Sequence, residues 1–308
     1  MSTAPGRRIP VTGLRRGKPR LAIGLLALAV VLAARPAAPA APVASAAEVA
    51  PVATAAEAAP VATAAGAAPA RPIPPERLRS GLDFAAPGIR ALQADDFANP
   101  GMLWVERGER LWGESAGAAA VSCASCHGKA ADAMKGVAAR YPRIDPESGA
   151  LRDLPAQINA CRVRRQQAPA WAAETEPLLA MTVYVATQSR GMPLSVSIDG
   201  PARPHFEAGR AIYERRMGQM NLACLNCHGE RWGGRLLAET ISQGHGTAYP
   251  IYRLDWQTVG SLERRFRSCL SGIRAEMWPY GSSEVIDLEL YLAWRAQGLP
   301  IETPGVRK

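Results

Sequence analysis

Two segments in the second half of the chain carry apolar residues at helical spacing. The apolar positions are Leu179, Val183 and Ala186 in the first segment and Ile286, Leu290 and Ala293 in the second. Residues three or four positions apart lie on one face of a helix, and a helix with one apolar face packs that face against a core. The pattern therefore predicts two amphipathic helices, each covering a small core.

The two segments belong to a longer internal duplication. Adding 101 to the residue number carries Glu106, Gly108, Leu111 and Trp112 onto Glu207, Gly209, Ile212 and Tyr213. Adding 107 carries Leu178, Tyr184, Gly191 and Pro193 onto Val285, Tyr291, Gly298 and Pro300. Self-similarity of this kind indicates two copies of one structural unit. We expect a mostly α-helical protein with two tandem domains, at residues 75–200 and 201–308.

The first quarter of the chain has a different composition. Six Arg or Lys residues between positions 7 and 20 precede an apolar run from Leu21 to Ala34 and then the small residues Ala44-Ser45-Ala46. This order is typical of a secretory signal peptide, which we place at residues 1–46. The run is shorter than the roughly 20 residues that span a bilayer, although an uncleaved anchor is an alternative. Residues 47–74 are rich in Ala and Pro and are expected to form a flexible linker.

Much of the excess positive charge belongs to this leader. The whole chain has 36 basic and 27 acidic residues, but residues 1–47 hold seven basic and no acidic ones. The rest of the chain therefore has 29 basic and 27 acidic residues and a net charge of only +2. A nearly balanced charge argues against binding to nucleic acid. The leader instead predicts export, and we expect a periplasmic protein.

Two CxxCH motifs carry the most specific chemistry in the sequence. They are Cys123-Ala124-Ser125-Cys126-His127 and Cys224-Leu225-Asn226-Cys227-His228. In c-type cytochromes the two thiols bind one porphyrin covalently and the histidine ligates its iron. A CxxC redox pair or half of a zinc site is the alternative, but a histidine follows the CxxC directly both times. We expect two covalently bound haem c groups, in domains that resemble class I cytochromes c.

Two further cysteines occupy equivalent positions in the two units. Adding 108 carries Cys161 onto Cys269, in the segment where a class I cytochrome c presents the second ligand of its iron. A thiolate there would favour ferric iron and lower the reduction potential. A disulfide between the two is the alternative, but residues that each face their own haem would be too far apart. Weaker candidates for a distal ligand are Met181, Met192, Met217, Met220, Met277, His205 and His245.

The surroundings of the two spare cysteines differ. Arg265 lies four residues before Cys269 and therefore on the same face of a helix. A guanidinium there would lower the pKa of the thiol and offer a planar pair of donors to a sulfur oxyanion. A solvated face of arginines is the alternative, and it describes neighbours such as Arg264. The residue four positions before Cys161 is Gln157, so we expect a structural or redox role for the first cysteine and a catalytic role for the second.

The chain resembles the SoxA family, whose members are dihaem subunits of the SoxAX cytochrome of bacterial thiosulfate oxidation. The residues that carry the resemblance are Tyr249-Pro250-Ile251-Tyr252-Arg253-Leu254-Asp255-Trp256-Gln257, Gly260-Ser261-Leu262, Arg264-Arg265-Phe266, Cys269, Arg274-Ala275-Glu276 and Leu288-Glu289-Leu290-Tyr291-Leu292-Ala293. The similarity covers roughly residues 75–308 and is densest after residue 240.

This resemblance implies an L-cysteine S-thiosulfotransferase, which joins thiosulfate oxidatively to a cysteine of the SoxYZ carrier protein. It implies that Cys269 carries a persulfide and that Arg265 binds the sulfonate end of thiosulfate. His127 and Cys161 would ligate the first haem iron, and His228 and Cys269 would ligate the second. The implied partners are the monohaem cytochrome SoxX, the SoxYZ carrier and an acceptor cytochrome c.

Two other functions are compatible with two haem motifs. A plain dihaem electron-transfer cytochrome would have Met or His as distal ligands and would tolerate the loss of Arg265. A dihaem peroxidase would need an open distal position with acidic or amide groups beside it. The paired Cys161 and Cys269 favour the thiosulfate-conjugating enzyme over both.

Overall fold

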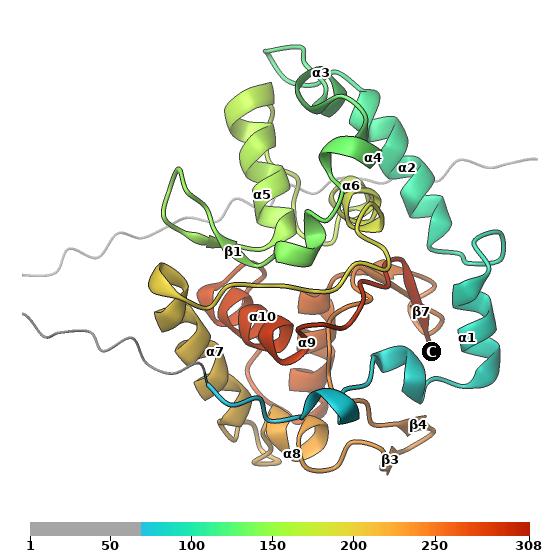
Figure 1. Ribbon diagram of the computed structural model, residues 1–308, viewed down its shortest axis with the longest axis vertical. Helices are drawn as coiled ribbons and strands as arrows, with labels where there is room; N and C mark the ends of the chain where they lie inside the picture. Colours follow the sequence, from blue (N-terminus) through green and yellow to red (C-terminus); the bar gives the residue numbers. More distant parts are fainter. Residues whose placement is uncertain (1–68) are drawn as a thin grey trace, which may run out of the picture. The chain divides into compact units, whose positions relative to one another are not determined.

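The computed structural model describes residues 69–308, which form a mostly helical protein with three small sheets (Figure 1). The prediction of a mostly α-helical protein is confirmed. The predicted signal peptide and residues 47–68 of the predicted linker lie outside the described residues. Within residues 69–308, none of the helices has the length and apolar character needed to cross a bilayer.

The first of the two predicted amphipathic helices, which we call the closing helix of its unit, is observed as α6. The helices up to residue 199 are η1 (Pro75–Arg77), η2 (Gly81–Phe84), α1 (Pro87–Ala94), α2 (Met102–Gly113), α3 (Cys123–His127), α4 (Ala130–Ala133), η3 (Ala138–Arg140), α5 (Leu154–Cys161), the π-helical turn η4 (Arg162–Gln166) and α6 (Glu176–Thr187). The strands β1 (Arg143–Ile144) and β2 (Leu151–Arg152) form an antiparallel pair. Leu179, Val183 and Ala186 of α6 are all buried, as their spacing predicts.

The second predicted closing helix is observed as α10. The remaining helices are η5 (Gly200–Ala202), α7 (Arg203–Glu214), α8 (Cys224–His228), α9 (Leu262–Gly272) and α10 (Ser283–Arg295). The remaining strands are β3 (Arg235–Leu236), β4 (Glu239–Thr240), β5 (Ile251–Arg253), β6 (Thr258–Gly260) and β7 (Gly305–Arg307). Leu290 of α10 is fully buried, and Ile286 and Ala293 are half-buried.

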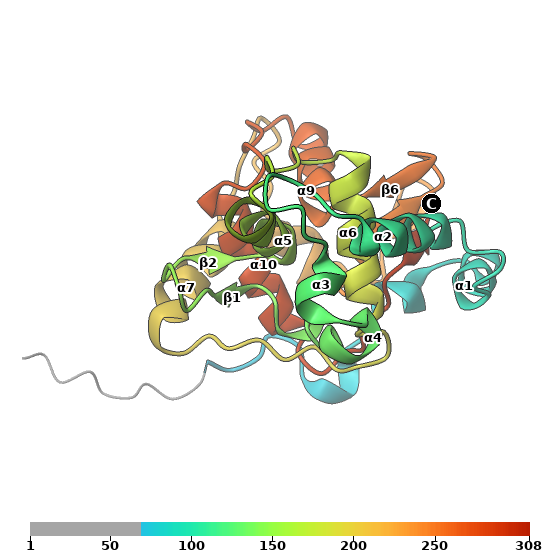
Figure 2. The same ribbon diagram turned by 90° about the horizontal axis from the view of Figure 1, so that it is seen from above.

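The same helix pair forms the centre of each unit. Helix α2 packs against α6, and α7 packs against α10 (Figures 1 and 2). A glycine lies at each crossing, since a Cβ on Gly108 would be 2.3 Å from the backbone oxygen of Ala180. A Cβ on Gly209 would be 2.0 Å from the backbone oxygen of Asp287. Only glycine allows helices to approach this closely, so the matching glycines of the sequence duplication perform one packing task twice.

The loops before the two CxxCH motifs also repeat. Gly117 and Gly218 have φ angles of +66° and +68°, which favour glycine. A Cβ on Gly117 would be 2.0 Å from the backbone oxygen of Gln166, and a Cβ on Gly218 would be 2.2 Å from that of Ile273. Both oxygens belong to the segment that follows a spare cysteine. Each unit therefore ties its CxxCH loop to the helix that carries that cysteine.

The helices that carry the spare cysteines begin with side-chain caps. The backbone N–H of Ala156 donates to Asp153 Oδ1 (2.8 Å) at the start of α5. The backbone N–H of Arg264 donates to Ser261 Oγ (3.0 Å) at the start of α9. Each cap satisfies an N–H that has no partner within its helix and so defines where the helix starts.

A three-stranded sheet joins the C-terminal end to the second unit. The strand order is β6-β5-β7, with β5 antiparallel to β6 and parallel to β7. The sequence analysis did not predict this sheet. Strands of three residues are too short to show the alternating pattern of a β-strand, and the pairing of β5 with β7 joins segments far apart in the chain.

Residues 69–100 pack against elements of the second unit. The backbone N–H of Arg79 donates to Gln243 Oε1 (2.8 Å), and Asn99 Nδ2 donates to the backbone oxygen of Pro304 (2.9 Å). The chain thus reaches the second unit before it forms the first helix pair. The domain boundaries at residues 75 and 201 stay predictions.

Candidate functional site

The first CxxCH motif forms the short helix α3. The backbone N–H of Ser125 donates to Ser122 Oγ (3.0 Å), which caps the helix. After the motif, the carbonyl of Gly128 accepts a hydrogen bond from the Trp112 indole N–H (2.9 Å). The ring of Trp112 lies 5.8 Å from the ring of His127. The end of α2 therefore holds the turn that presents His127.

Cys161 lies close to this first motif. It is the last residue of α5, it is half-buried, and the side-chain amide of Gln157 donates to its sulfur (3.6 Å). Burial raises the pKa of the Cys123 thiol to about 11, and the neighbouring Cys161 adds to the rise. Such an effect requires the two thiols to be near each other. The structure therefore brings Cys161 close to the first motif.

The second CxxCH motif forms α8, and residues 242–244 contact the ring of its histidine, His228. The Nδ1–H of His228 donates to the backbone oxygen of Ser242 (2.8 Å). A Cβ on Gly244 would be 2.8 Å from Cγ of His228, so this segment packs directly against the imidazole ring. Because Nδ1 carries the proton in this hydrogen bond, Nε2 is the ring nitrogen with a free lone pair.

Cys269 lies close to this second motif and is exposed. Burial raises the pKa of the Cys224 thiol to about 11, and Cys269 adds to the rise. Burial and the neighbouring Cys269 also raise the pKa of Cys227. Helix α9 therefore presents a solvent-accessible thiol near both cysteines of the motif.

Arg265 lies one helical turn before Cys269, and Tyr249 lies beside both. Burial lowers the pKa of the Arg265 guanidinium, but the Cys269 thiol, the Tyr249 phenol and the carboxylates of Glu239 and Asp255 together raise it. Burial raises the pKa of Tyr249, so its phenol keeps its proton. The result is an exposed thiol with a half-buried guanidinium and a phenol behind it.

All six cysteines of the chain lie within the described residues, and no disulfide links any two of them. The alternative disulfide between Cys161 and Cys269 is therefore not formed. Each of the two instead acts on the pKa of a cysteine in its own CxxCH motif. This arrangement agrees with equivalent positions in two separate sites.

The two other histidines each contact a polar side chain. His245 Nε2 lies 3.2 Å from Gln243 Oε1, and burial lowers the pKa of His245 to about 3. His245 follows the segment that packs behind His228. His205 Nδ1 lies 2.7 Å from Asp287 Oδ1 and forms an ion pair when it is protonated. These contacts give both histidines roles in packing and in hydrogen bonding.

Comparisons with known proteins connect this geometry with one family. A family model that describes the SoxA/TsdA cytochrome c domain matches residues 107–194 and 208–301. The chain is also 40% identical over 232 residues to the L-cysteine S-thiosulfotransferase subunit SoxA of Rhodovulum sulfidophilum. This alignment covers 75% of the chain and 81% of that relative. The chain belongs to the SoxA family.

Further relatives support the assignment. The SoxA subunit of Pseudaminobacter salicylatoxidans is 41% identical over 230 residues, which is 74% of this chain and 80% of the relative. The crystal structure of SoxXA from P. pantotrophus contains a chain that superposes with a TM-score of 0.73 at 38% identity. That match covers 75% of this chain and 87% of the solved one. The two tandem cytochrome c domains predicted from the sequence are therefore confirmed.

Cytochrome c domains of the SoxA family imply covalently bound haem, and the second site fits such a group. The side-chain atoms Tyr213 Oη, Arg295 Nε and His245 Nδ1 are buried without a hydrogen-bond partner among the described residues. Arg295 is only 2% exposed and donates to the backbone oxygen of His228 (3.4 Å). It forms no ion pair with a carboxylate in residues 69–308. A buried guanidinium requires an anion, and the propionates of haem are anions.

The first site fits the same group through its apolar wall. Side chains packed around the first core include Trp112, Met134, Tyr141, Ile158 and Tyr184. The rings of Trp112 and Tyr184 lie 6.0 Å apart. Aromatic and aliphatic side chains of this kind suit a flat porphyrin better than they suit a small ion.

Sequence reasoning missed two residues of the second site. Tyr249 belongs to the family stretch but received no role, because nothing in the local pattern indicates that it lies beside Cys269. Arg295 could have been noticed as a charged residue at the end of an apolar helix, where the first unit has Gln188. Its guanidinium lies 4.4 Å from the centre of the Tyr213 ring.

Proposed function

We propose that this chain is the dihaem subunit of an L-cysteine S-thiosulfotransferase. In this reaction the sulfane sulfur of thiosulfate forms a bond with a cysteine sulfur of a SoxYZ-type carrier, the thiol loses its proton, and two electrons are released. Relatives named for this activity align with three quarters of the chain. The single observation that carries the proposal is the exposed Cys269 one turn from Arg265 and beside the second CxxCH motif.

Cys269 is the proposed reactive residue. A persulfide on this cysteine is more acidic and more nucleophilic than a thiol, which suits an exchange of sulfur. Its exposure on α9 allows a cysteine of a carrier protein to reach it. Cys161 is less suited to this role, because it is half-buried and has a neutral amide as its neighbour.

Arg265 is the proposed binding residue for thiosulfate. Its guanidinium presents parallel N–H donors, which match two oxygens of a sulfonate group. With the sulfonate held at Arg265, the other sulfur of thiosulfate points along the helix face toward Cys269. The protonated phenol of Tyr249 adds a neutral donor beside this position.

Two haem c groups are part of the proposal. The covalent attachment residues are Cys123 and Cys126 for the first haem and Cys224 and Cys227 for the second. His127 and Cys161 would hold the first iron, and His228 and Cys269 would hold the second. The Nδ1 hydrogen bond of His228 supports its assignment, because it leaves Nε2 free for a metal. Haem bound at these residues would supply an acceptor for the two electrons that formation of the S–S bond releases.

The proposed partners are a SoxX-type monohaem cytochrome, a SoxYZ-type carrier and an acceptor cytochrome c. The SoxX partner is supported by the likeness to a chain of the SoxXA crystal structure. The proposed location is the periplasm, because the basic and apolar leader resembles a secretory signal peptide and because an export route suits covalent haem attachment.

Peptide mass spectrometry on the exported, haem-loaded protein tests this function. The Cys269 peptide is compared before and after incubation with thiosulfate. We expect an added sulfur or a thiosulfate adduct on this peptide, and no adduct on the Cys161 peptide. A Cys269→Ala variant that still shows the same haem absorbance is the matched control for loss of the modification.

Two outcomes would contradict the proposal. One is a thiol on Cys269 that stays unmodified under all conditions, and the other is a cross-link between Cys161 and Cys269. Either would favour a plain electron-transfer cytochrome. Rapid reaction with peroxide by the protein without thiosulfate turnover would favour the peroxidase instead.

A further inference from the structure

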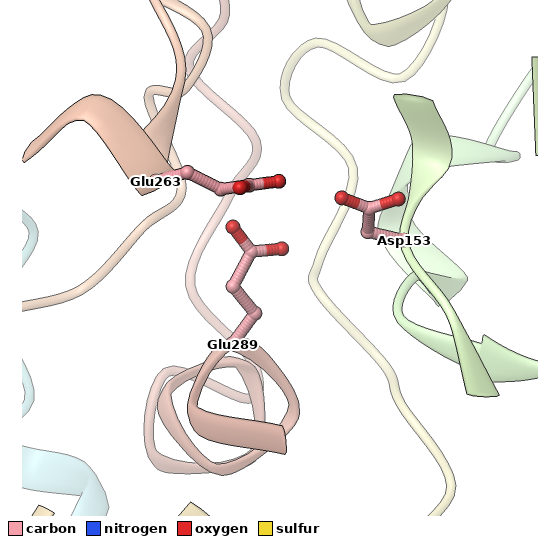
Figure 3. Close-up of side chains that lie close together, drawn as sticks. All are labelled: Asp153, Glu263 and Glu289. Carbon is pink, nitrogen blue, oxygen red and sulfur yellow. The ribbon is translucent and has the colours of Figure 1, made fainter. Parts of the chain in front are cut away.

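Three carboxylates meet in a cavity between the two cytochrome c domains (Figure 3). Asp153 comes from the first domain, and Glu263 and Glu289 come from the second. One oxygen of each carboxylate lies within 4.8 Å of an oxygen of each of the others. The cavity has a volume of about 120 Å³ and is lined by residues of both domains. Tyr141 and Tyr249 also line this cavity, but the three carboxylates have no role in the proposed sulfur chemistry.

No ion pair compensates the negative charge of this cluster within residues 69–308, although the nearby Arg267 partly offsets the rise in the pKa of Glu263. The backbone N–H of Ala156 donates to Asp153 Oδ1 (2.8 Å), and the backbone N–H of Gly281 donates to Glu263 Oε2 (2.7 Å). Glu289 makes no hydrogen bond to a described residue. None of the three carboxylates forms an ion pair with an Arg, Lys or His of residues 69–308. The second oxygens of Asp153 and Glu263 and both oxygens of Glu289 therefore remain available to a ligand.

Burial makes this arrangement costly unless something compensates the charge. It raises the pKa of Asp153 to about 6 and that of Glu263 to about 7. Burial and repulsion from the other two carboxylates raise the pKa of Glu289 well above its usual range. Either protons or a cation must neutralise the cluster.

Thr247 is an independent sign of a ligand in the same cavity. This threonine lines the cavity with the three carboxylates and is only 3% exposed. Its hydroxyl oxygen has no hydrogen-bond partner among the described residues. A buried hydroxyl without a partner is rare in folded proteins, because its desolvation is not repaid. A bound cation with its water molecules would satisfy this oxygen.

We propose that Asp153, Glu263, Glu289 and Thr247 bind one divalent cation of the calcium type. All the donors are oxygens, which suit hard cations and disfavour zinc or copper. Calcium ligands lie about 2.3–2.6 Å from the ion, so two ligands on opposite sides are separated by about the largest distance that this cluster shows. The remaining coordination positions belong to water in the cavity.

The site would join the two helices that carry the spare cysteines. Asp153 is the cap of α5, whose last residue is Cys161. Glu263 lies in the first turn of α9, which carries Cys269. A cation held between these two residues would fix the starts of both helices relative to each other. Its role is to position the two domains, and it takes no part in the transfer of sulfur.

Equilibrium dialysis of the haem-loaded chain tests the proposal. Protein is first treated with a chelator and then dialysed against about 1 mM Ca²⁺, and bound metal is counted by mass spectrometry. We expect one Ca²⁺ per chain, a higher unfolding temperature with Ca²⁺ present, and binding of Mg²⁺ that is at least about tenfold weaker.

Variants distinguish this site from surface carboxylates. Glu289→Gln and Asp153→Asn should each weaken Ca²⁺ binding at least about 100-fold, and Thr247→Val about tenfold. Asparagine can still cap α5, so Asp153→Asn should keep the fold. The control is Glu284→Gln. Glu284 lies on α10, as Glu289 does, but outside the cluster, so this variant should bind Ca²⁺ normally. Unchanged haem absorbance confirms that each variant is folded.

Three results would overturn the proposal. The first is the absence of stoichiometric Ca²⁺ binding at this concentration. The second is binding that persists in Glu289→Gln. The third is a Glu289→Gln protein that is more stable than the chelated parent while neither binds a cation, since this would show that protons neutralise the cluster.

Discussion

The two domains place a spare cysteine at the same point of the same scaffold but surround it differently. Cys161 is half-buried at the end of α5, where the neutral amide of Gln157 donates to its sulfur. Cys269 is exposed within α9 and has Arg265 one turn before it. The helix crossings and the loop contacts are duplicated, while the charge and the exposure of the cysteine are not. Reactivity therefore depends on a few side chains added to a repeated backbone.

The largest expected difference between the domains is in activity. Cys269→Ala should lower the rate of thiosulfate conjugation about 10⁴-fold or more, because it removes the proposed reactive sulfur. Cys161→Ala should keep the rate within about tenfold, because Cys161 does not meet the substrate. Turnover with a carrier protein, measured on complexes with equal haem content, checks both. Equal losses in the two variants would show that the domains share the chemistry.

A smaller loss is expected when the charge beside Cys269 is removed. Arg265→Gln should lower kcat/KM about 100-fold, because thiosulfate loses a charged pair of donors. The control is Arg264→Gln, since Arg264 pairs with Glu174 (3.8 Å) and lies over the Trp256 ring (4.4 Å). That variant should stay within about twofold of the parent. Similar losses in both would mean that the effect is one of surface charge.

The helix crossings should respond alike in the two domains. Gly209→Ala and Gly108→Ala should each lower the free energy of unfolding by about 2 kcal/mol, because the new Cβ meets a backbone oxygen of the partner helix. Gly113→Ala is the control, since a Cβ there meets nothing within 4 Å. Unfolding by urea, monitored by helical circular dichroism, measures all three. A tolerated Gly209→Ala would contradict the assigned crossing.

The smallest change in the free energy of unfolding is expected at the C-terminal ends of α6 and α10. Arg295 donates to the backbone oxygen of Gln243 (3.1 Å) and stacks on Tyr213, whereas the first domain has Gln188 at this point. Arg295→Gln should lower the free energy of unfolding by about 1 kcal/mol, because a charged donor is lost from buried acceptors. Gln188→Ala should change it by less than about 0.5 kcal/mol. Thermal unfolding of the haem-loaded proteins measures both changes. A larger loss of stability in Gln188→Ala than in Arg295→Gln would contradict the role assigned to Arg295.

Much of the site could be predicted because its signals are local. The CxxCH motifs are defined by spacing alone, and Arg265 and Cys269 share a helix face, so that no tertiary contact is needed to place them together. The duplication then assigned equivalent places to Cys161 and Cys269. Tyr249 lay outside such reasoning, because it reaches the site from a different segment.

The sequence by itself determined the two amphipathic helices, the internal duplication, the two CxxCH motifs, the equivalence of the spare cysteines and the family, since each depends on residue type and short-range spacing. Only the tertiary structure decided that Cys269 is exposed, that Arg295 is buried behind His228, and that three carboxylates from both domains share one cavity. Burial and charge compensation depend on segments far apart in the chain, and a linear pattern contains no record of which of them will meet.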